Sequence, residues 1–340
     1  MLALYQRRKV SPASWYNVEP RKTISKETVL KTPSKLAALS GVLLPITTPF
    51  ERDGALDLAS LRSNILKWNE TAITGYVVLG STGERVNLSE DEQRQVIATA
   101  REGVPSDRLF IAGVGQQSTR VTIQEIEKLS EAVAVGAVLV ITPHFYRAAI
   151  TQAALVEHYR AVADASPVPL ILYSMPALTG IKIEPATAAA LSEHSNIIGI
   201  KDSSNDVAAL KETINLVQAG FAVLTGNGTV LHEALDAGAC GGILAVGCVA
   251  PELCLEIFSA AKSSDQERSR RLQSALTPLA SAVTTRFGIG GLKAALDSSG
   301  YVGGHVRAPL RAPDDQAIAE IQSCLETAAQ ALLAEAAAPA

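Results

Sequence analysis

The sequence predicts a (β/α)8 barrel (a TIM barrel) with a C-terminal helical appendage. Two observations predict it: eight short, almost unbroken apolar runs recur along the chain, and segments with helical spacing separate them. Strands buried on both faces of a parallel sheet read as such runs. Eight strand–helix units in about 220 residues fit a closed barrel better than an open doubly wound sheet. The runs are GVLLPITTPF (41–50), GYVVLG (75–80), LFIAGVG (109–115), AVLVITP (137–143), PLILYSMP (169–176), IIGIKDSS (197–204), FAVLTGNG (221–228) and GGILAVG (241–247).

The segments between these runs have the periodicity of amphipathic helices. In 57–73 the apolar residues fall on one helical face, and in 89–102 Ser89 and Glu92 form a capping box before an apolar pair. No GxGxxG follows the first run, which argues against a dinucleotide-binding fold.

Strand signals stop near residue 264, and this defines the expected domains. Segments 267–287, 290–300 and 314–339 read as helices. We therefore expect a catalytic barrel in 41–264 and a helical C-terminal region in 265–340.

Residues 1–40 differ from the rest in charge. They hold eight Lys and Arg against two Glu, a net charge of +6, whereas the whole chain carries −4. A basic, acid-poor start is typical of an organelle transit peptide, and equally of a flexible tail or an arm that packs on a partner subunit. We expect a tail without a chemical role on a cytoplasmic protein, with a mitochondrial location as the alternative.

Composition excludes several other classes of protein. The chain is 47% hydrophobic and 19% charged, without an apolar run long enough to span a bilayer, so we expect no membrane partner. Its net negative charge gives no electrostatic case for binding nucleic acid. The cysteines have neither CxxC spacing nor a histidine at ligand spacing, which predicts reduced thiols and no metal site; they are Cys240, Cys248, Cys254 and Cys324.

A lysine ends one of the predicted buried strands. Lys201 lies in SNIIGIKDSSND (195–206), where it could be a salt-bridged or snorkelling side chain, or a nucleophile. Active sites of (β/α)8 barrels lie at the C-terminal ends of the strands. Other polar residues end or lie within these strands, which favours the nucleophile: Thr47, Thr48, Ser81, Thr82, Tyr173, Thr225 and Asn227. Alternation along the strand should point Asp202 away from this mouth.

The sequence GSTGE (80–84) directly follows the second run. Gly80 and Gly83 permit a tight turn whose backbone N–H groups face inward, a concave anion site of the nest type. A small carboxylate or a phosphate would suit it. An ordinary strand-to-helix loop is the alternative interpretation of these five residues.

Three motifs taken together resemble the dihydrodipicolinate synthase/N-acetylneuraminate lyase family of pyruvate-dependent class I aldolases. They are GSTGE, YSMPALTG (173–180) and GIKDSS (199–204). The 28-residue step from Tyr173 to Lys201 matches the family's spacing, and TTPF, TPHFY and GGILAV extend the resemblance over most of 41–310. Each motif alone is weak, but three in the right order are specific.

The resemblance implies a mechanism centred on Lys201. Its amine would attack the keto group of pyruvate or another 2-oxo acid and form a Schiff base, after desolvation has lowered the lysine pKa from about 10.4. Tyr173 would carry the proton to and from the reacting oxygen. No metal or organic cofactor is required, because the lysine supplies the covalent chemistry.

The resemblance also implies the residues that bind the substrate. The backbone N–H groups of Ser81 and Thr82, with the Thr82 hydroxyl and the turn at Gly83, would hold the carboxylate. Gly226 and Ile243 match positions that line the pyruvate pocket.

Two positions depart from the family pattern. Leu178 stands where the dihydrodipicolinate-forming members carry an arginine that binds the second substrate's carboxylate, and leucine cannot replace that clamp. Phe145 stands where the family has a second relay tyrosine, lent across a subunit interface. Tyr146 or His144 is the alternative proton carrier.

The 4-hydroxy-2-oxoglutarate aldolases, which release pyruvate and glyoxylate, are the branch most similar to this chain. AVTTRFGIGGLKAAL (282–296) and GYVGGHVRAPL (300–310) resemble that branch, in which Ser203 would contact substrate. The branch usually has asparagine at the position of Thr82, whereas the lyases and synthases have threonine.

We therefore expect a Schiff-base aldolase that acts on a small 2-oxo acid, most like a 4-hydroxy-2-oxoglutarate aldolase. Dihydrodipicolinate synthase or another sugar-acid aldolase of the family is the alternative. A protein of another class is a further alternative, namely a barrel that binds 2-oxo acids without catalysing a reaction. Phe145 and Leu178 motivate it, because both remove a polar group from the expected site. The resemblance implies a homotetramer built as a dimer of dimers.

Overall fold

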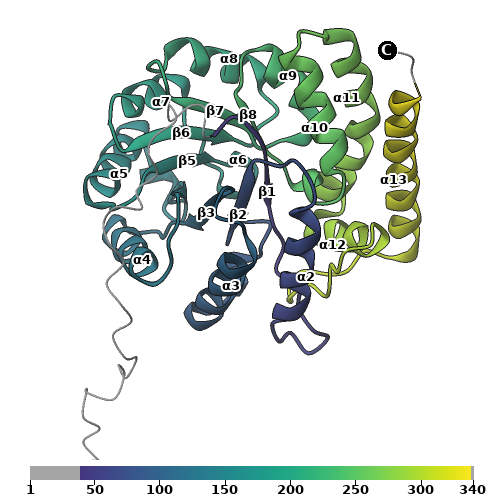
Figure 1. Ribbon diagram of the computed structural model, residues 1–340. Helices are drawn as coiled ribbons and strands as arrows, with labels where there is room; N and C mark the ends of the chain where they lie inside the picture. The colour runs from purple at the N-terminus through teal and green to yellow at the C-terminus, as the bar shows by residue number, and fades with distance from the viewer. Residues whose placement is uncertain (1–38, 338–340) are drawn as a thin grey trace, which may run out of the picture. The chain divides into compact units, whose positions relative to one another are not determined.

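The computed structural model describes residues 39–337, so the basic segment 1–40 lies outside the described residues except for its last two positions. Within this range eight parallel strands close into a barrel in chain order, as predicted (Figure 1). The strands are β1 (Gly41–Pro45), β2 (Gly75–Val78), β3 (Leu109–Val114), β4 (Ala137–Ile141), β5 (Leu170–Ser174), β6 (Ile197–Asp202), β7 (Ala222–Thr225) and β8 (Gly241–Ile243).

Helices follow the strands and cover the outside of the barrel (Figure 1). They are α2 (Leu58–Trp68), α3 (Glu90–Gly103), α4 (Thr119–Ala132), α5 (Gln152–Ala165), α7 (Pro185–Ser192), α8 (Val207–Leu216), α9 (Leu231–Asp236) and α10 (Pro251–Lys262). Short helical turns lie between strand ends and helices: α6 (Pro176–Thr179) and the 3₁₀ turns η2 (Arg85–Asn87), η3 (Arg147–Ala149), η4 (Gly228–Val230) and η5 (Ala245–Cys248).

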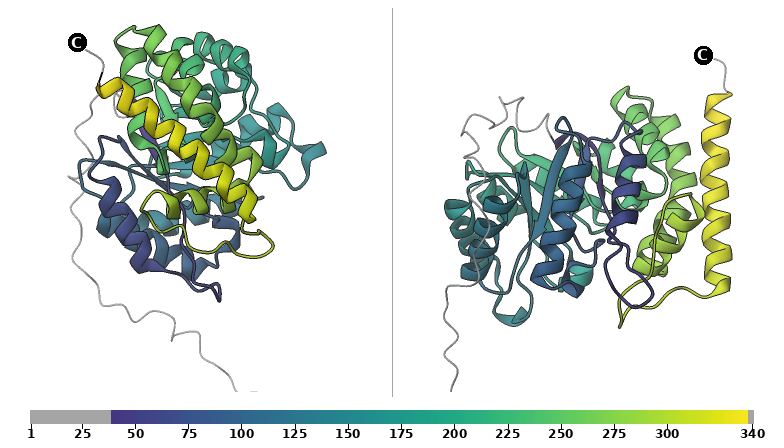
Figure 2. Two further views of the ribbon diagram at one scale, coloured as in Figure 1. Left: turned by 90° about the vertical axis from the view of Figure 1, so that its right-hand side faces the viewer. Right: turned by 60° about the horizontal axis from the view of Figure 1, so that its bottom comes forward.

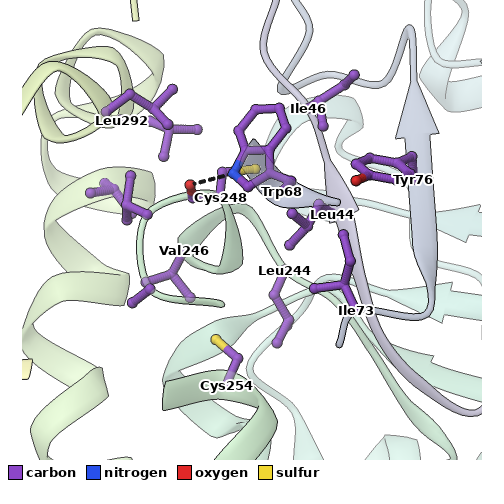
Figure 3. Close-up of a cluster of buried hydrophobic side chains, with 14 of the residues drawn as sticks. Leu44, Ile46, Trp68, Ile73, Tyr76, Leu244, Val246, Cys248, Cys254 and Leu292 are labelled. Carbon is purple, nitrogen blue, oxygen red and sulfur yellow. Dashed lines mark hydrogen bonds between the residues drawn. The ribbon is translucent and has the colours of Figure 1, made fainter. Parts of the chain in front are cut away.

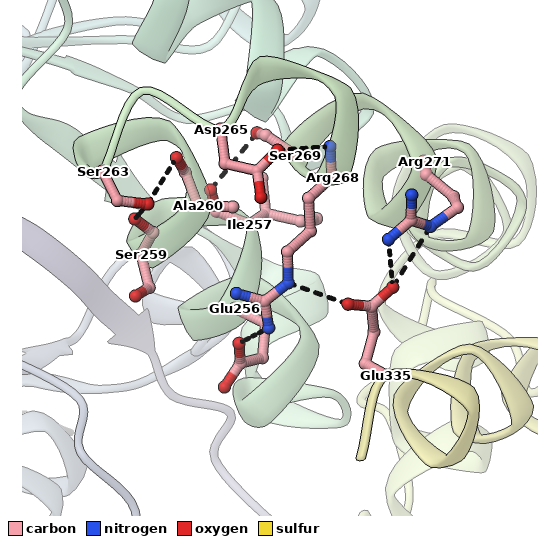
Figure 4. A network of polar contacts seen from close by, with 10 residues as sticks. All are labelled: Glu256, Ile257, Ser259, Ala260, Ser263, Asp265, Arg268, Ser269, Arg271 and Glu335. Carbon is pink, nitrogen blue, oxygen red and sulfur yellow. Dashed lines mark hydrogen bonds and ion pairs between the residues drawn. The ribbon is translucent and has the colours of Figure 1, made fainter. Parts of the chain in front are cut away.

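The C-terminal region is helical, as the sequence predicts. It comprises α11 (Gln266–Ser281), a π-helical turn η6 (Ala282–Arg286), α12 (Gly288–Ser298) and α13 (Asp315–Ala336). Helix α13 packs against α11 and α12, and lies beside α11 in both views (Figure 2). Glu335 of α13 accepts hydrogen bonds from Arg268 at 2.8 Å and Arg271 at 2.6 Å, both on α11 (Figure 4).

Two apolar layers hold the barrel together. The inner layer consists of side chains that point into the barrel, among them Leu43, Val77, Ile111 and Leu139. An outer layer fills the space between strands and helices. There Trp68 is fully buried, and its indole N–H donates to the carbonyl of Cys248 at 2.9 Å (Figure 3). A buried indole needs such a partner for its N–H.

Some boundaries differ from the expected ones. The run 241–247 gives a strand of only three residues, because η5 follows at Ala245. Helix α2 ends at Trp68, short of residue 73, and the Thr71 hydroxyl donates to the carbonyl of Trp68. The capping box of α3 is confirmed, with Ser89 and Glu92 bonded in both directions. None of the helices between residues 39 and 337 has the length and apolarity that a bilayer crossing requires.

Candidate active site

A β-bulge in β6 points Lys201 into the barrel. Leu170 of β5 pairs with Ile197, but the next residue, Ile171, pairs with Gly199, so Ile198 is an extra residue. Ile198 belongs to the inner layer, whereas Ile197 and Ile200 pack in the outer one. Side chains alternate along a regular strand, so if Ile198 points inward, Lys201, three residues later, would point outward. The extra residue shifts the alternation by one position, and Lys201 therefore points inward.

Lys201 is buried at the mouth of the barrel and has no counter-ion in the part of the chain that the structure describes. The residue is 4% exposed, and its Nζ lies 4.4 Å from the centre of the Tyr173 ring on the neighbouring strand. Within residues 39–337 neither a carboxylate nor a hydrogen-bond acceptor contacts this Nζ. Long charged side chains are rarely buried unless they are paired. The structure therefore rejects the salt-bridged interpretation of this lysine.

Gly226 makes room for the lysine at the end of β7. A Cβ at this position would lie 2.6 Å from Lys201 Cε and would overlap the Ser203 hydroxyl oxygen. That oxygen is itself buried and has no hydrogen-bond partner among the described residues. The structure thus brings together Lys201, Ser203 and Gly226, three of the predicted site residues.

Tyr173, whose ring lies against the lysine, also contacts the turn after β2. The Tyr173 hydroxyl lies 3.0 Å from the Ser81 hydroxyl, within hydrogen-bond distance. The turn is closed by two hydrogen bonds, from Gly83 N–H to the Gly80 carbonyl and from Glu84 N–H to the Ser81 carbonyl, each 3.1 Å.

This closure leaves two N–H groups for a ligand. Within residues 39–337 no protein acceptor binds the N–H of Ser81 or Thr82. We call these two N–H groups the amide cradle. Together with the buried Thr82 side chain they are hydrogen-bond donors of the kind that binds a small anion.

The glycines of this turn do not act as expected. The left-handed residues are Leu79, with φ of 59°, and Glu84, with φ of 53°, whereas Gly80 and Gly83 have ordinary backbone angles. Gly83 is needed for close approach, because a Cβ there would lie 3.1 Å from the Ile46 carbonyl oxygen. Two bulky residues in the left-handed region indicate strain that the surroundings must hold.

A buried ion pair that was not predicted from the sequence lies behind this turn. Lys293 of α12 is 1% exposed, and its Nζ lies 2.6 Å from the Glu84 carboxylate, which is 2% exposed. Burial lowers the pKa of Lys293, and Glu84 opposes that shift. No short-range sequence pattern connects these two residues.

The remaining predicted residues lie deeper or further out. Ile243 is fully buried in the inner layer at the end of β8. Tyr146 is 72% exposed and forms an edge-to-face pair with Phe145; within the described chain no hydrogen bond or ring contact joins it to Lys201 or Tyr173. Its role stays a prediction. Leu178, on α6, is also exposed.

Other reactive side chains serve packing. Burial raises the pKa of Cys248 and Cys254, so both stay protonated thiols. Asp202 points away from Lys201 and accepts from the Ser204 N–H at 2.7 Å. In the part of the chain that the structure describes, no three His, Cys, Asp or Glu residues gather in a way that could hold a metal ion.

Similarity to known proteins identifies the family of this chain. The model of the dihydrodipicolinate synthetase family matches residues 38–328. The chain belongs to this family. A DapA-like lyase from Halobacterium salinarum is 35% identical over 287 residues, which cover 84% of this chain and 93% of the relative. The 4-hydroxy-tetrahydrodipicolinate synthase of Exiguobacterium sp. is 31% identical over 84% of this chain and 97% of its own.

Solved structures of the dihydrodipicolinate synthetase family have the same fold. The enzyme from Thermotoga maritima superposes with a TM-score of 0.80 at 29% identity, covering 85% of this chain and 98% of that one. A pyruvate complex of the chloride-inhibited enzyme from Acinetobacter baumannii gives 0.80 at 30% identity, with 85% and 99% covered. This family member is therefore an enzyme, a carbon–carbon lyase of the class I aldolase type, and takes a small-molecule substrate.

Proposed function

We propose that the protein is a Schiff-base aldolase that cleaves a 4-hydroxy-2-oxo acid, with Lys201 as the nucleophile. The observation that supports it most is the burial of Lys201, which has no carboxylate partner among residues 39–337 and lies against Tyr173, the residue whose hydroxyl meets the Ser81 turn. An amine at the strand ends of the barrel, beside hydroxyl groups, is placed to act as a nucleophile toward a carbonyl group.

The proposed chemistry begins at the keto carbon. The Lys201 amine attacks C2 of the bound 2-oxo acid and expels water to form an iminium ion, while the amide cradle holds the C1 carboxylate. Tyr173 accepts the proton of the C4 hydroxyl, the C3–C4 bond breaks, and an aldehyde leaves. The electron pair of that bond remains on C3 as an enamine. Protonation of C3 and hydrolysis of the iminium then release pyruvate and restore the amine.

Two features support a 2-oxo acid as the ligand. The amide cradle provides hydrogen-bond donors for a carboxylate, on a turn whose Ser81 hydroxyl lies 3.0 Å from the hydroxyl of Tyr173, the residue against Lys201. The Acinetobacter baumannii relative was solved in complex with pyruvate.

Among aldol substrates, we place 4-hydroxy-2-oxoglutarate first, with pyruvate and glyoxylate as products. Ser203 supports this choice, because its buried hydroxyl lies at the lysine and has no hydrogen-bond partner between residues 39 and 337. Synthesis of 4-hydroxy-tetrahydrodipicolinate is the second candidate, favoured by the names of several relatives. The exposed leucine at position 178 disfavours it, since a leucine side chain cannot bind a second carboxylate as an arginine would.

The test is reductive trapping followed by intact-protein mass spectrometry. Wild type, Lys201→Met and the control Lys211→Ala are each incubated with pyruvate and sodium borohydride. We expect one reduced pyruvyl adduct on wild type and control, and none on Lys201→Met, whose side chain fills the same space without an amine. Steady-state cleavage of 4-hydroxy-2-oxoglutarate should then release glyoxylate.

Each alternative predicts a different result. Adduct without turnover of any aldol substrate would support a silent barrel that binds 2-oxo acids. Formation of 4-hydroxy-tetrahydrodipicolinate in preference to glyoxylate release would support the synthase. Absence of the adduct on wild type would refute the Schiff base altogether. Homo-oligomeric assembly and a cytoplasmic location stay predictions from the sequence.

A further inference from the structure

The buried pair of Glu84 and Lys293 contacts the turn that carries the amide cradle. Glu84 is the fifth residue of GSTGE, two positions after Thr82, and has the left-handed backbone described above. Its own N–H closes the turn on the Ser81 carbonyl at 3.1 Å. The direction of the cradle N–H groups therefore depends on the conformation of Glu84.

Lys293 connects this turn to the end of β1. Its ammonium group donates hydrogen bonds to the Thr48 carbonyl at 2.8 Å and the His305 carbonyl at 2.5 Å, and forms an ion pair with the Glu84 carboxylate at 2.6 Å. The Thr48 hydroxyl in turn donates to the Gly83 carbonyl at 2.8 Å. The lysine thus restrains the turn through Glu84 and, by way of Thr48, through Gly83.

The second oxygen of the Glu84 carboxylate is held by another C-terminal residue. It accepts the backbone N–H of Arg307 at 3.1 Å and the Asn87 amide at 3.3 Å. The Arg307 guanidinium binds the Glu92 carboxylate through two N–H groups and donates to the Asn87 carbonyl at 2.7 Å. Both oxygens of Glu84 are therefore fixed by the region that follows the barrel.

We propose that Glu84 and Lys293 are positioning residues that fix the amide cradle for the carboxylate of the 2-oxo acid. Neither touches the reacting atoms. The inference rests on the proposed function and deepens it, since it assigns the C-terminal region a role in substrate binding. It predicts that loss of the pair weakens the binding of ligands that have a carboxylate, and leaves imine formation with ligands that lack one unchanged.

The experiment compares two ketones. Borohydride trapping on Lys201 is measured as a function of pyruvate concentration, and separately with hydroxyacetone, which has the ketone but no carboxylate. The variants are Glu84→Gln and the double variant Glu84→Gln/Lys293→Met, which removes both charges and leaves none unpaired. Glu125→Gln is the matched control, because it breaks the neighbouring ion pair with Arg85 and does not contact the turn.

In Glu84→Gln and in the double variant we expect the half-saturating pyruvate concentration to rise about tenfold, the effect of losing roughly one charge-assisted hydrogen bond. Adduct formation with hydroxyacetone should stay within about twofold of wild type, because it does not use the amide cradle. Glu125→Gln should match wild type with both ketones.

Three results would overturn the inference. An unchanged pyruvate dependence in the variants would do so. A similar loss of adduct formation with pyruvate and with hydroxyacetone would also do so, because it would indicate general disruption of the site. If neither variant folds, Thr48→Val carries the test: it removes only the hydrogen bond to Gly83, and an unchanged pyruvate dependence there refutes the positioning role. A wild type that forms no pyruvate adduct refutes the proposed function itself, a result distinct from these three.

Discussion

Replacing Gly226 with alanine tests the packing around Lys201 directly. The added Cβ would lie 2.6 Å from Lys201 Cε, whereas ordinary contact begins at 3.4 Å. The lysine Cε must therefore move by about 0.8 Å, and Nζ with it; a displacement of this size lowers the rate of an aligned reaction about 10²-fold. The overpacked site should also lose about 1–3 kcal/mol of unfolding free energy.

The assay is the rate at which the borohydride-trapped pyruvyl adduct appears at saturating pyruvate, measured with a urea unfolding curve. Gly136→Ala is the matched control, because the nearest atom to its new Cβ is the Phe110 carbonyl oxygen at 3.6 Å, an ordinary contact. The double variant Gly226→Ala/Ser203→Ala removes the overlap with the serine hydroxyl but not the one with Lys201. It should regain stability without regaining rate. Adduct formation in Gly226→Ala at a rate within about threefold of wild type would refute this account.

Three further predictions concern proton transfer and pH. Tyr173→Phe keeps the ring against Lys201 but removes the hydroxyl, so we expect adduct formation to persist while aldol cleavage falls about 10²–10⁴-fold in steady-state assays; full cleavage activity would exclude Tyr173 as the proton carrier. Burial lowers the pKa of His158 to about 4 from 6.5, so the unfolded chain binds its proton first as the pH falls. Wild type should lose up to about 3 kcal/mol between pH 6.5 and 4 from this residue, and urea titrations of His158→Gln should lack that slope. The hydrogen bond from Arg307 lowers the pKa of Glu92 to about 2 from 4.5. That stabilisation is complete above pH 4.5 and is lost as the pH falls through about 2, so Glu92→Gln should be less stable by about 1–2 kcal/mol at pH 7, after allowance for partial exposure, and equal to wild type near pH 2.

The barrel could be predicted because its cause is local. Each strand is buried on both faces, so eight apolar runs are visible in the sequence without knowledge of their neighbours. The capping box at Ser89 and Glu92 is local in the same way. For the same reason the residues at the strand ends, Lys201 and Ser81 among them, could be assigned to one mouth.

The direction of Lys201 could not be derived from periodicity. It depends on the extra residue at Ile198, and a bulge is set by pairing with β5, which the sequence of β6 alone does not encode. The family resemblance supplied the assignment instead. The left-handed residues of the turn were also missed, because glycine is the expected residue there and Leu79 and Glu84 are not.

The ion pair of Glu84 and Lys293 could not be predicted from a local pattern, because its partners are far apart in the sequence. The same holds for the contact between Lys293 and Thr48, which are 245 positions apart. Glu92 illustrates the same limit. Its place in a helix start is evident from the sequence, but its bond to Arg307 arises only when the C-terminal region folds back onto the barrel.

That fold-back has a consequence for how the protein is made. Arg307 leaves the ribosome 223 residues after Glu84, and at about 5–20 residues per second the interval is about 11–45 s. Once β8 ends at Ile243 all eight strands have been made, yet Glu84 still lacks both the Lys293 ammonium and the Arg307 amide. The turn with two left-handed residues is thus completed by residues that are synthesised after the whole barrel. A nascent chain that stalls after β8 holds its nucleophile but not a finished anion site.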